Sequence, residues 1–492
     1  MKVPELRRRI LFTLAMIVVV RLGVQIPLPG IDVMELQKVI EASANASGPG
    51  AGLATVLTIF SGGGLQQCGI FALGIMPYIS ASIMTQLLSA VVPQWAKMVR
   101  EEGGRQKMTK WTRAIAIVIA LVQGWFLVGT LEHPERLQAV GLNIPADCQL
   151  VIDPGIQFAL MTVLIMVAGT MFLMWIGDQI TERGVGNGVS LIISVNIIHA
   201  LPGAVTLAWK TLVYKDGTVV PMGAMLLVAL IAFLIVVVAL VVTVTQAQRR
   251  IPVQYAKRVM GNKMFNGATQ YLPLKLNYSG VMPVIFATAI LSLPQVLFSQ
   301  IAHYNTTLQW IATKMNDCLN PASSGYYIIS GLMIFFFSYF WVATMFQPSQ
   351  IAEDLKRNGG YIPGIRPGPP TALFLDQTMQ RLTFAGSAFL TLIYFLPSLL
   401  NIGGNIPYLV TQFFGGTSLL ILVGVLLDMM RQVETTLLSR NYDGFLKKGK
   451  LKGKYGHIQG TGAAAGSRTV TVMWIVIALL VLAGAIAYNA MQ

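Results

Sequence analysis

The chain has 492 residues, of which 54% are hydrophobic and only 11% are charged. Soluble proteins carry about 25% charged residues, so this composition excludes an ordinary soluble domain and indicates a polytopic membrane protein. The formal net charge is +15, and its placement along the chain is more informative than its size.

Eleven apolar stretches are each close to the ~20 residues that a helix needs to cross a bilayer core. We expect no cleavable signal peptide, because the basic start Arg7-Arg8-Arg9 leads into a run without a small-residue cleavage site. The predicted spans lie at about 10–29, 60–92, 113–131, 155–177, 188–208, 223–244, 278–300, 326–346, 382–400, 408–430 and 469–488.

The basic residues gather on one side of the predicted membrane. With the N-terminus inside and the spans alternating, 29 of the 35 Lys and Arg residues are intracellular, which sets the orientation. The loop 245–277 carries basic residues and no acidic ones. This loop suits an acidic or nucleic-acid partner. Topology together with anionic lipid explains the same pattern, and the sequence leaves both explanations open.

The second apolar stretch is interrupted in its middle. After Phe60 it contains the glycine run 62–64, and then Gly74-Ile75-Met76-Pro77. A proline inside a helix removes a backbone hydrogen bond and clashes with the preceding turn. In hydrocarbon such a break is tolerated only where it is buried in protein or lines a wet cavity. This stretch therefore borders a path through the protein.

The same break recurs in the other half of the chain as Gly280-Val281-Met282-Pro283. Ile79 and Ile285 stand at the same offset from the two glycines. Spans one to five and six to ten form two groups of five, so the second group is inverted relative to the first, and paired interruptions are typical of inverted repeats. A chance match is the alternative, because Gly and Pro are common in membrane helices.

Enzymatic and metal chemistry has little support in the sequence. Few ionisable residues lie inside the first ten spans; Arg21 is one, and Asp428 lies near the intracellular end of the tenth. No HExxH or nucleophile–base motif is present, and the four histidines are scattered. The three cysteines are too few for a disulfide framework and lack metal-ligand spacing. We expect no enzyme, no cofactor and no bound metal. A small-solute secondary transporter with inverted repeats is the alternative, but ion-coupled transporters usually bury charges along their path.

Several long, ordered motifs run through the chain. They are Ile26-Pro-Leu-Pro-Gly-Ile-Asp32, Phe60-Ser-Gly-Gly, the segment 70–82 around the first break, Gly169-Thr-Met-Phe-Leu-Met-Trp175, Ile180-Thr-Glu-Arg-Gly-Val-Gly-Asn-Gly188, Tyr255-Ala-Lys-Arg258, Leu272-Pro-Leu-Lys275, Pro363-Gly-Ile-Arg-Pro-Gly368 and Gly415-Gly-Thr-Ser-Leu-Leu420. Together they resemble the SecY family, whose members are the central subunits of the bacterial protein-translocation channel. The similarity covers about residues 2–456.

The resemblance implies an all-α clamshell of ten helices in two inverted halves, 1–208 and 209–431. A plug at about 57–71 would close the external side. Residues 432–468 would form a basic cytoplasmic tail and linker. The stretch 469–488 departs from the family, because it adds an eleventh span that would place the C-terminus outside.

The resemblance also assigns site residues. The pore ring would be Ile75, Ile79, Val189, Ile193, Ile285 and Ile421, and the plug would include Phe60, Leu65 and Cys68. The lateral gate between spans two and seven would include Ser80, Ser82, Thr85, Gln86 and Pro283. Helix–helix hydrogen bonding is the alternative explanation for the four polar residues of span two, and in this fold both can hold. A collar of branched apolar side chains excludes water and ions by dewetting.

Two cytoplasmic loops match the family's docking sites for the ribosome and the SecA motor ATPase. The resemblance assigns these contacts to Arg249, Arg250, Lys257, Arg258, Lys263, Lys356, Arg357 and Arg366. Small subunits resembling SecE and SecG, signal sequences, nascent chains and the lipid bilayer would be the other partners. The implied function is to conduct unfolded secretory proteins across the bacterial plasma membrane and to release apolar segments sideways into it.

Overall fold

The computed structural model describes much of the chain in detail. The described residues are 4–32, 34–35, 61–64, 67–101, 103–132, 150–215, 218–219, 221–255, 258–260, 263–265, 269–304, 310, 314–315, 318–319, 323–402, 410, 413 and 417–447. The eleventh predicted span and the linker before it lie outside them.

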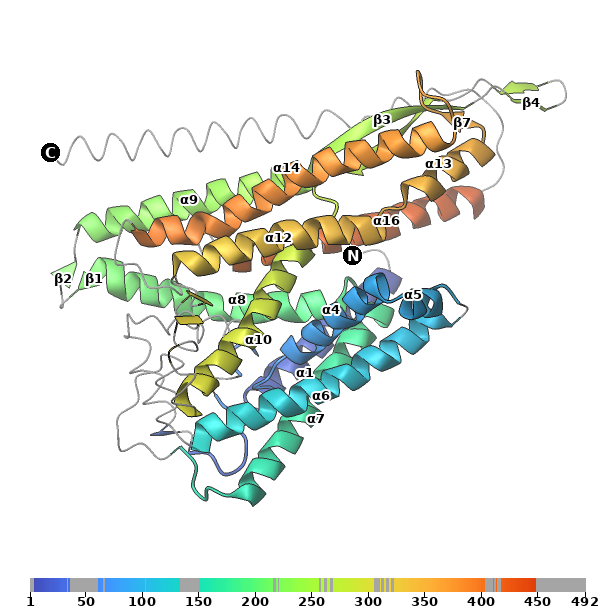
Figure 1. The fold of residues 1–492 in the computed structure, drawn as a ribbon. Coiled ribbons are helices and arrows are strands. Elements are labelled where there is room, and N and C mark those ends of the chain that lie inside the picture. The colour runs from blue at the N-terminus through green and yellow to red at the C-terminus, as the bar shows by residue number, and fades with distance from the viewer. Residues whose placement is uncertain are drawn as a thin grey trace.

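Long helices make up most of the molecule (Figure 1). The first half contains α1 (Pro4–Val24), α4 (Met76–Val91), α5 (Pro93–Arg100), α6 (Gly104–Glu132), α7 (Ile156–Arg183) and α8 (Gly188–Ala208). The second half contains α9 (Pro221–Gln246), α10 (Met282–Tyr304), α12 (Ser324–Met345), α13 (Pro348–Arg357), α14 (Pro369–Ile402) and α16 (Thr417–Lys447). Each of the first ten predicted spans holds one long helix from this set.

Among the described residues, six helices are long and apolar enough to cross a membrane by length and hydropathy. They are Gln106–Gly129, Ile156–Arg183, Gly188–Thr211, Met225–Gln246, Gly325–Arg357 and Pro369–Leu396. The start of α10 adds a shorter apolar helix, Met282–Leu291.

The two halves face each other across α8 and α10. In Figure 1, α4, α6 and α7 lie on one side, α9, α12 and α14 lie on the other, and α10 crosses obliquely between them. Helix α10 contacts α4, and α8 contacts α16; among the described residues these are the most extensive helix contacts between the halves. A π-helical turn, η2 (Trp209–Val213), connects the halves between α8 and α9.

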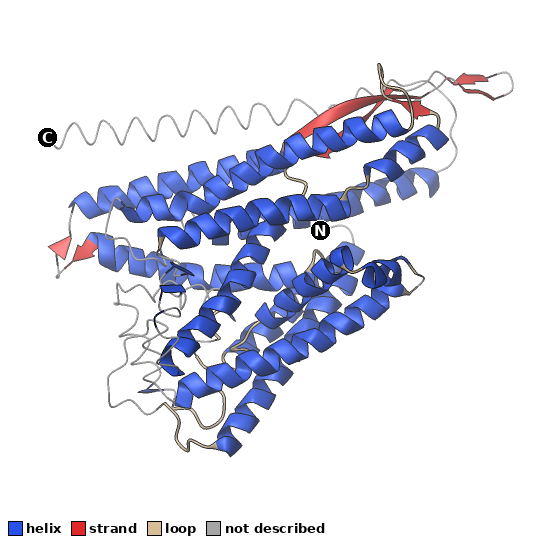
Figure 2. Ribbon diagram, in the orientation of Figure 1, coloured by secondary structure: helices blue, strands red, loops and turns tan. Residues whose placement is uncertain are grey.

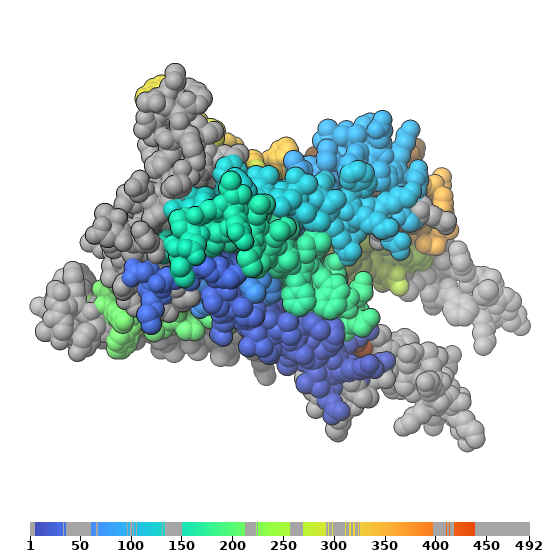
Figure 3. Space-filling view, turned by 90° about the horizontal axis from the view of Figure 1, so that it is seen from below, coloured from blue at the N-terminus to red at the C-terminus, as the bar shows by residue number. Residues whose placement is uncertain are grey.

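The outer surface of the first half is apolar. Helices α1, α6 and α7 lie side by side on the face shown in Figure 3. Leu14, Val118 and Leu160 on these helices are each at least half exposed. Apolar side chains exposed on this scale are costly in water and suit a hydrocarbon environment.

The predicted helical membrane fold is confirmed, and the loop 245–277 adds a β-hairpin to it. Strand β3 (Gln248–Tyr255) pairs antiparallel with β6 (Thr269–Lys275) and with β7 (Gly360–Tyr361), so the order is β6-β3-β7. The segment between β3 and β6 forms a second hairpin, in which β4 (Arg258–Met260) pairs with β5 (Lys263–Phe265). At the opposite end of the molecule, β1 (Tyr214–Lys215) pairs with β2 (Thr218–Val219) (Figure 2).

The β3–β6–β7 sheet joins the loops 245–277 and 347–381 into one unit. Ile251, Val253 and Leu274 on its inner face are at most 3% exposed and pack in an apolar cluster with Phe346 and Leu375 of the second half. Strand alternation turns the other face outward. The sheet is therefore fastened to the ends of the helices by its own small core.

Candidate functional site

The repeated Gly-x-Met-Pro motif is a helix start in both halves. Gly74 and Gly280 have φ values of +59° and +65°, a left-handed conformation that glycine adopts without a Cβ penalty. Helices α4 and α10 then begin at Met76 and Met282, which places a proline in the first turn, where its missing N–H costs nothing.

Both motifs position an isoleucine in the same way. The amide of Ile79 donates to the carbonyl oxygen of Ile75 at 3.1 Å, and the amide of Ile285 donates to that of Val281 at 3.3 Å. Each isoleucine thus closes the first hydrogen-bonded turn of its helix, five residues after a left-handed glycine. The repeat noticed in the sequence is therefore a repeat of local structure.

The residues assigned to the pore ring lie together in the largest apolar cluster of the described residues. Ile75, Ile79, Ile193, Ile285 and Ile421 are each at most 5% exposed, and Val189 packs against them half-buried. They come from the turn before α4 and from α4, α8, α10 and α16, so both halves contribute. An apolar collar built from both halves can widen if the halves separate.

Close helix contacts hold two of these positions. A Cβ at Gly424 would lie 2.6 Å from Cγ1 of Val281, so α16 approaches the start of α10 one turn after Ile421. A Cβ at Gly177 would lie 3.5 Å from Cγ2 of Val189, which sets the start of α8 against α7. Small residues at these crossings allow the helices to come close.

The residues assigned to the lateral gate do not share one environment. Ser80 is 8% exposed, and Pro283 is buried at the start of α10. Thr85 instead lies 3.0 Å from the hydroxyl of Thr112 in α6. Its hydroxyl also donates to the carbonyl oxygen of Ala81. Thr85 is therefore occupied within the first half, and we leave it out of the proposed gate.

Gln86 is bonded on one side only. Its Nε2 atom donates to Oγ of Ser82 at 3.3 Å. Its Oε1 atom is buried and finds no hydrogen-bond donor in the described part of the chain. A buried carbonyl oxygen without a donor loses hydration without compensation. Gln86 thus has a free acceptor on the helix that faces α10.

The plug region is only partly described. Phe60 and Leu65 lie outside the described residues. Among the described residues of this region, Ser61 is helical, residues 62–64, 67–68 and 70–75 run as turns, and Gly69 forms a β-bridge with Pro27, so no helix continues to Phe71. Cys68 is 3% exposed and packs in a second apolar cluster with residues of α6 and α7, not in the cluster that contains the ring. The glycines of this segment favour turns over a continuous helix.

The sheet separates two basic residues that are adjacent in sequence. Arg250 lies on the outward face of the sheet with Pro252 and Tyr271. Arg249 lies on the opposite face of the strand, the one that carries the buried Ile251. Lys257 lies outside the described residues. In the β4–β5 hairpin, Arg258 pairs with Phe265 and Lys263 pairs with Met260. The sequence could not show this division, because it depends on the strand register.

The second basic loop presents its charges at a defined position. Lys356 and Arg357 end α13 and are exposed, and Arg357 pairs with Glu353 at 3.2 Å. The hydroxyl of Thr371 donates to the carbonyl oxygen of Arg366 at 2.8 Å, while the Arg366 side chain is exposed. Left-handed Gly364 and Gly368 flank it. Arg366 is thus held by its backbone and free at its side chain.

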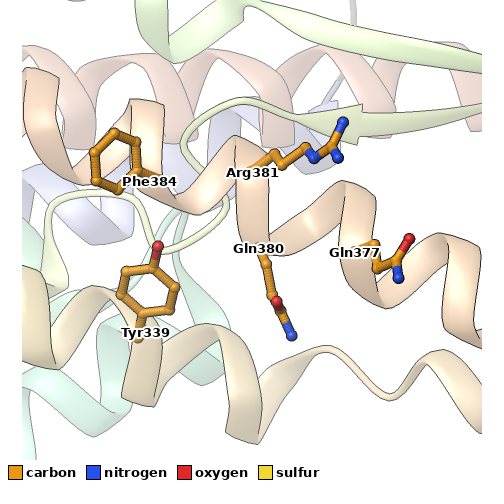
Figure 4. Close-up of a pocket in the computed structure, with 5 residues that line it drawn as sticks. All are labelled: Tyr339, Gln377, Gln380, Arg381 and Phe384. Atoms are coloured by element: carbon orange, nitrogen blue, oxygen red, sulfur yellow. The ribbon is translucent and has the colours of Figure 1, made fainter.

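A groove of about 460 Å³ lies between α12 and α14, away from the ring (Figure 4). Its lining residues are Tyr339, Gln377, Gln380, Arg381 and Phe384, and none of them belongs to the central cluster. Gln380 donates to Asp376 at 2.9 Å on the same helix. The groove is a surface feature of the second half and not part of the predicted path.

One contact near the ring was not anticipated from the sequence. Arg21 of α1 is hydrogen-bonded to Asn196 of α8 and to the backbone of Gly62. The sequence identified Arg21 as an ionisable residue inside a span, but it did not identify Asn196 as its partner. A polar residue in an otherwise apolar run, three positions after a ring residue, is the signal that could have identified Asn196.

Comparison with known proteins supports this architecture. A family model described as SecY matches residues 69–430. The protein translocase subunit SecY of Streptomyces coelicolor is 41% identical over 452 residues, covering 91% of this chain and 98% of that protein. The SecY subunit of Thermotoga maritima is 38% identical, covering 92% and 98% of the two chains.

Solved structures agree in fold at lower identity. A structure described as that of a protein conducting channel has a TM-score of 0.56 and 17% identity, and it covers 92% of this chain and 96% of that one. Sec61 in a canine ribosome–channel complex from the endoplasmic reticulum has a TM-score of 0.54 with the same coverage. With the family model matching most of its length and relatives about 40% identical over 91–92% of it, this chain belongs to the SecY family.

Proposed function

We propose that this chain is the central, pore-forming subunit of a protein-conducting channel in the bacterial plasma membrane. The observation that carries the proposal is the apolar ring, to which both halves contribute through a repeated helix start. Such a ring excludes water and ions when closed and yields around an extended polypeptide when the halves move apart. The related translocase subunits support the same role.

We assign the lateral gate to the contact between α4 and α10. This is one of the most extensive helix contacts between the halves in the described part of the chain, and Ser80, Ser82, Gln86 and Pro283 lie on its two helices. A leucine-rich signal segment gains about 0.3–0.6 kcal/mol per residue on entering a membrane. A dozen such residues therefore outweigh a few polar contacts, and they can leave through this gate into lipid.

We assign partner docking to the cytoplasmic face around the β3–β6–β7 sheet. Arg250, Arg366 and the exposed end of α13 present positive charge there. This charge suits ribosomal RNA or an acidic surface of a SecA-like motor. Solved relatives include channels bound to ribosomes, which favours the first of these partners. SecE-like and SecG-like subunits would complete the complex.

We also propose that the N-terminus is cytoplasmic and that the stretch 469–488 crosses the membrane as an eleventh span. It is apolar, uncharged and long enough to do so. The N-terminal half (1–208) and C-terminal half (209–431) then act as the two bodies of the clamshell.

Site-specific crosslinking tests the proposed channel. In a chain whose native cysteines are replaced, Ile285→Cys is paired with a cysteine in a stalled secretory precursor. We expect an adduct that depends on a functional signal sequence. Leu332→Cys is the matched control, because Leu332 is 67% exposed on the outer side of α12 and should give no adduct. No adduct at Ile285 or at Ile79, with precursor bound, would contradict the pore assignment and favour a solute transporter.

A further inference from the structure

A half-buried arginine lies beside the ring and contacts the segment assigned to the plug. Near the end of α1, Nη2 of Arg21 donates to Oδ1 of Asn196 in α8. Nη1 of Arg21 also lies 3.4 Å from the carbonyl oxygen of Gly62. Asn196 is 3% exposed. Charged side chains inside membrane spans are rare and usually serve a function, which makes this contact a candidate.

The turn formed by residues 61–64 fits closely against this pair. Its residues are buried, and Gly62 and Gly63 have φ values of +65° and +85°. A Cβ at Gly62 would collide with Nη2 of Arg21 and Oδ1 of Asn196. A Cβ at Gly63 would lie 3.6 Å from Nε2 of His199. The turn therefore requires glycine both for its backbone conformation and for its distance from α1 and α8.

The contact lies just beyond the ring along α8. Asn196 follows Ile193 by three residues, which corresponds to about 4.5 Å along a helix axis. Helix α8 begins at Gly188, beside Val189 of the ring, and runs toward the predicted external side. The 61–64 turn is thus held on the external side of the ring, where a segment that blocks the path would have to rest.

We propose that Arg21 and Asn196 hold the plug in the closed channel by binding the 61–64 turn. This inference rests on the proposed function. Opening of the channel would break the contact to Gly62, so its strength would set how strong a signal sequence must be to open the pore. Arg21 and Asn196 are positioning residues in this account, because they act through the plug and not on the translocating chain.

The contact is suited to reversible release. Nε of Arg21 is buried and has no hydrogen-bond partner in the described part of the chain. The guanidinium is therefore only partly satisfied in the closed form, and part of its desolvation remains uncompensated. A fully paired arginine would hold the turn more strongly and would make opening harder.

Two substitutions at Asn196 should act in opposite directions. Asn196→Ala removes the partner of Arg21, and we expect the ratio of closed to open channels to fall about tenfold, the effect of losing one hydrogen bond to a charged group. Asn196→Asp adds a charge-assisted bond to Arg21 and should favour the closed channel. Ser194→Ala is the matched control, because Ser194 is also buried on α8 and its hydroxyl donates to Ser190 of the same helix.

The purified channel complex is reconstituted in vesicles for two measurements. Ion leak without precursor should rise for Asn196→Ala. Translocation of a precursor with a weakened signal sequence should rise for Asn196→Ala and fall for Asn196→Asp. Ser194→Ala should match the unmodified chain in both measurements. Because the leak needs no precursor, it reports on the plug independently of transport.

The outcomes separate the two proposals. Unchanged leak and unchanged signal dependence in both Asn196 variants, with normal translocation by the unmodified complex, would overturn the holding contact. Shifts of both variants in the same direction would mean that Asn196 has only a structural role and would also overturn it. Absence of translocation by the unmodified complex would overturn the proposed channel instead.

Discussion

At the residue scale, Gly188 shows how little room the helices leave each other. It is the first residue of α8, and a Cβ there would collide with the carbonyl oxygen of Gly177 in α7 and lie 2.7 Å from its carbonyl carbon. A collision with backbone cannot be relieved by a rotamer change, so α7 and α8 would have to separate.

We predict that Gly188→Ala destabilises the protein by about 1–3 kcal/mol or more, the range observed for overpacking. Thermal unfolding of the purified protein in detergent measures the loss. Gly203→Ala, in the same helix, is the control, because a Cβ at Gly203 has nothing within 4 Å. Equal unfolding temperatures for the two variants would mean that the α7–α8 contact is not as close as the structure shows.

The ring makes a second prediction at this scale. Ile285→Asn places a polar side chain at a position that is 2% exposed and favours water in the collar. We expect increased ion conductance in planar bilayers. Ile285→Val removes one methylene, keeps the position apolar and should conduct close to the unmodified level. If the Asn variant conducted ions no more than the Val variant, Ile285 would not belong to the seal.

At the element scale, the β3–β6–β7 sheet depends on its own small core. Leu274 is 3% exposed and packs with the helix ends, whereas Tyr271 on the same strand is 61% exposed. The sheet should therefore fold or unravel locally, without requiring the membrane helices to change.

We predict that Leu274→Ala destabilises the sheet by about 2–5 kcal/mol, as buried leucine truncations do. Tyr271→Ala, the control, should change stability by less than about 0.5 kcal/mol. Hydrogen exchange of the β3 amides reports the difference. Equal protection in the two variants would show that the inner face contributes no more to the sheet than the outer face.

At the scale of the whole molecule, the described residues of the two halves meet chiefly at the α4–α10 and α8–α16 helix pairs, and a short connection links the halves. The backbone amide of Gly186, in the turn before α8, donates to Oε1 of Gln432 in α16 at 2.8 Å. The α8–α16 contact thus joins the halves at the start of α8, at the end of that helix opposite the connection that begins at Trp209. We propose that the other contact, between α4 and α10, is the one that opens.

Topology gives the prediction for the whole chain. If the stretch 469–488 crosses the membrane, Gln492→Cys should react with an impermeant maleimide added to intact cells from outside. A cysteine placed at Lys448, in the basic tail, should react only after permeabilisation and serves as the control. If Gln492→Cys reacted only in permeabilised cells, the C-terminus would be cytoplasmic and the eleventh span would not cross the membrane.

The sequence by itself determined the features that depend on neighbouring residues. Apolar length and charge bias predicted the helices of the first ten spans and a membrane fold, because both are local properties of the chain. The Gly-x-Met-Pro repeat predicted two corresponding interruptions, because glycine and proline set the backbone conformation at their own positions. Ile79 and Ile285 could be matched in this way before any contact was known.

The tertiary structure alone decided which side chains meet. Thr85 contacts α6 rather than α10. Arg249 and Arg250 lie on opposite faces of one strand. Arg21 is hydrogen-bonded to Asn196, which lies 175 positions away in the chain. Each of these depends on strand register or on how distant helices pack. The physical reason is that hydropathy, charge and helix propensity act along the chain, whereas a hydrogen bond needs two groups within about 3 Å in space.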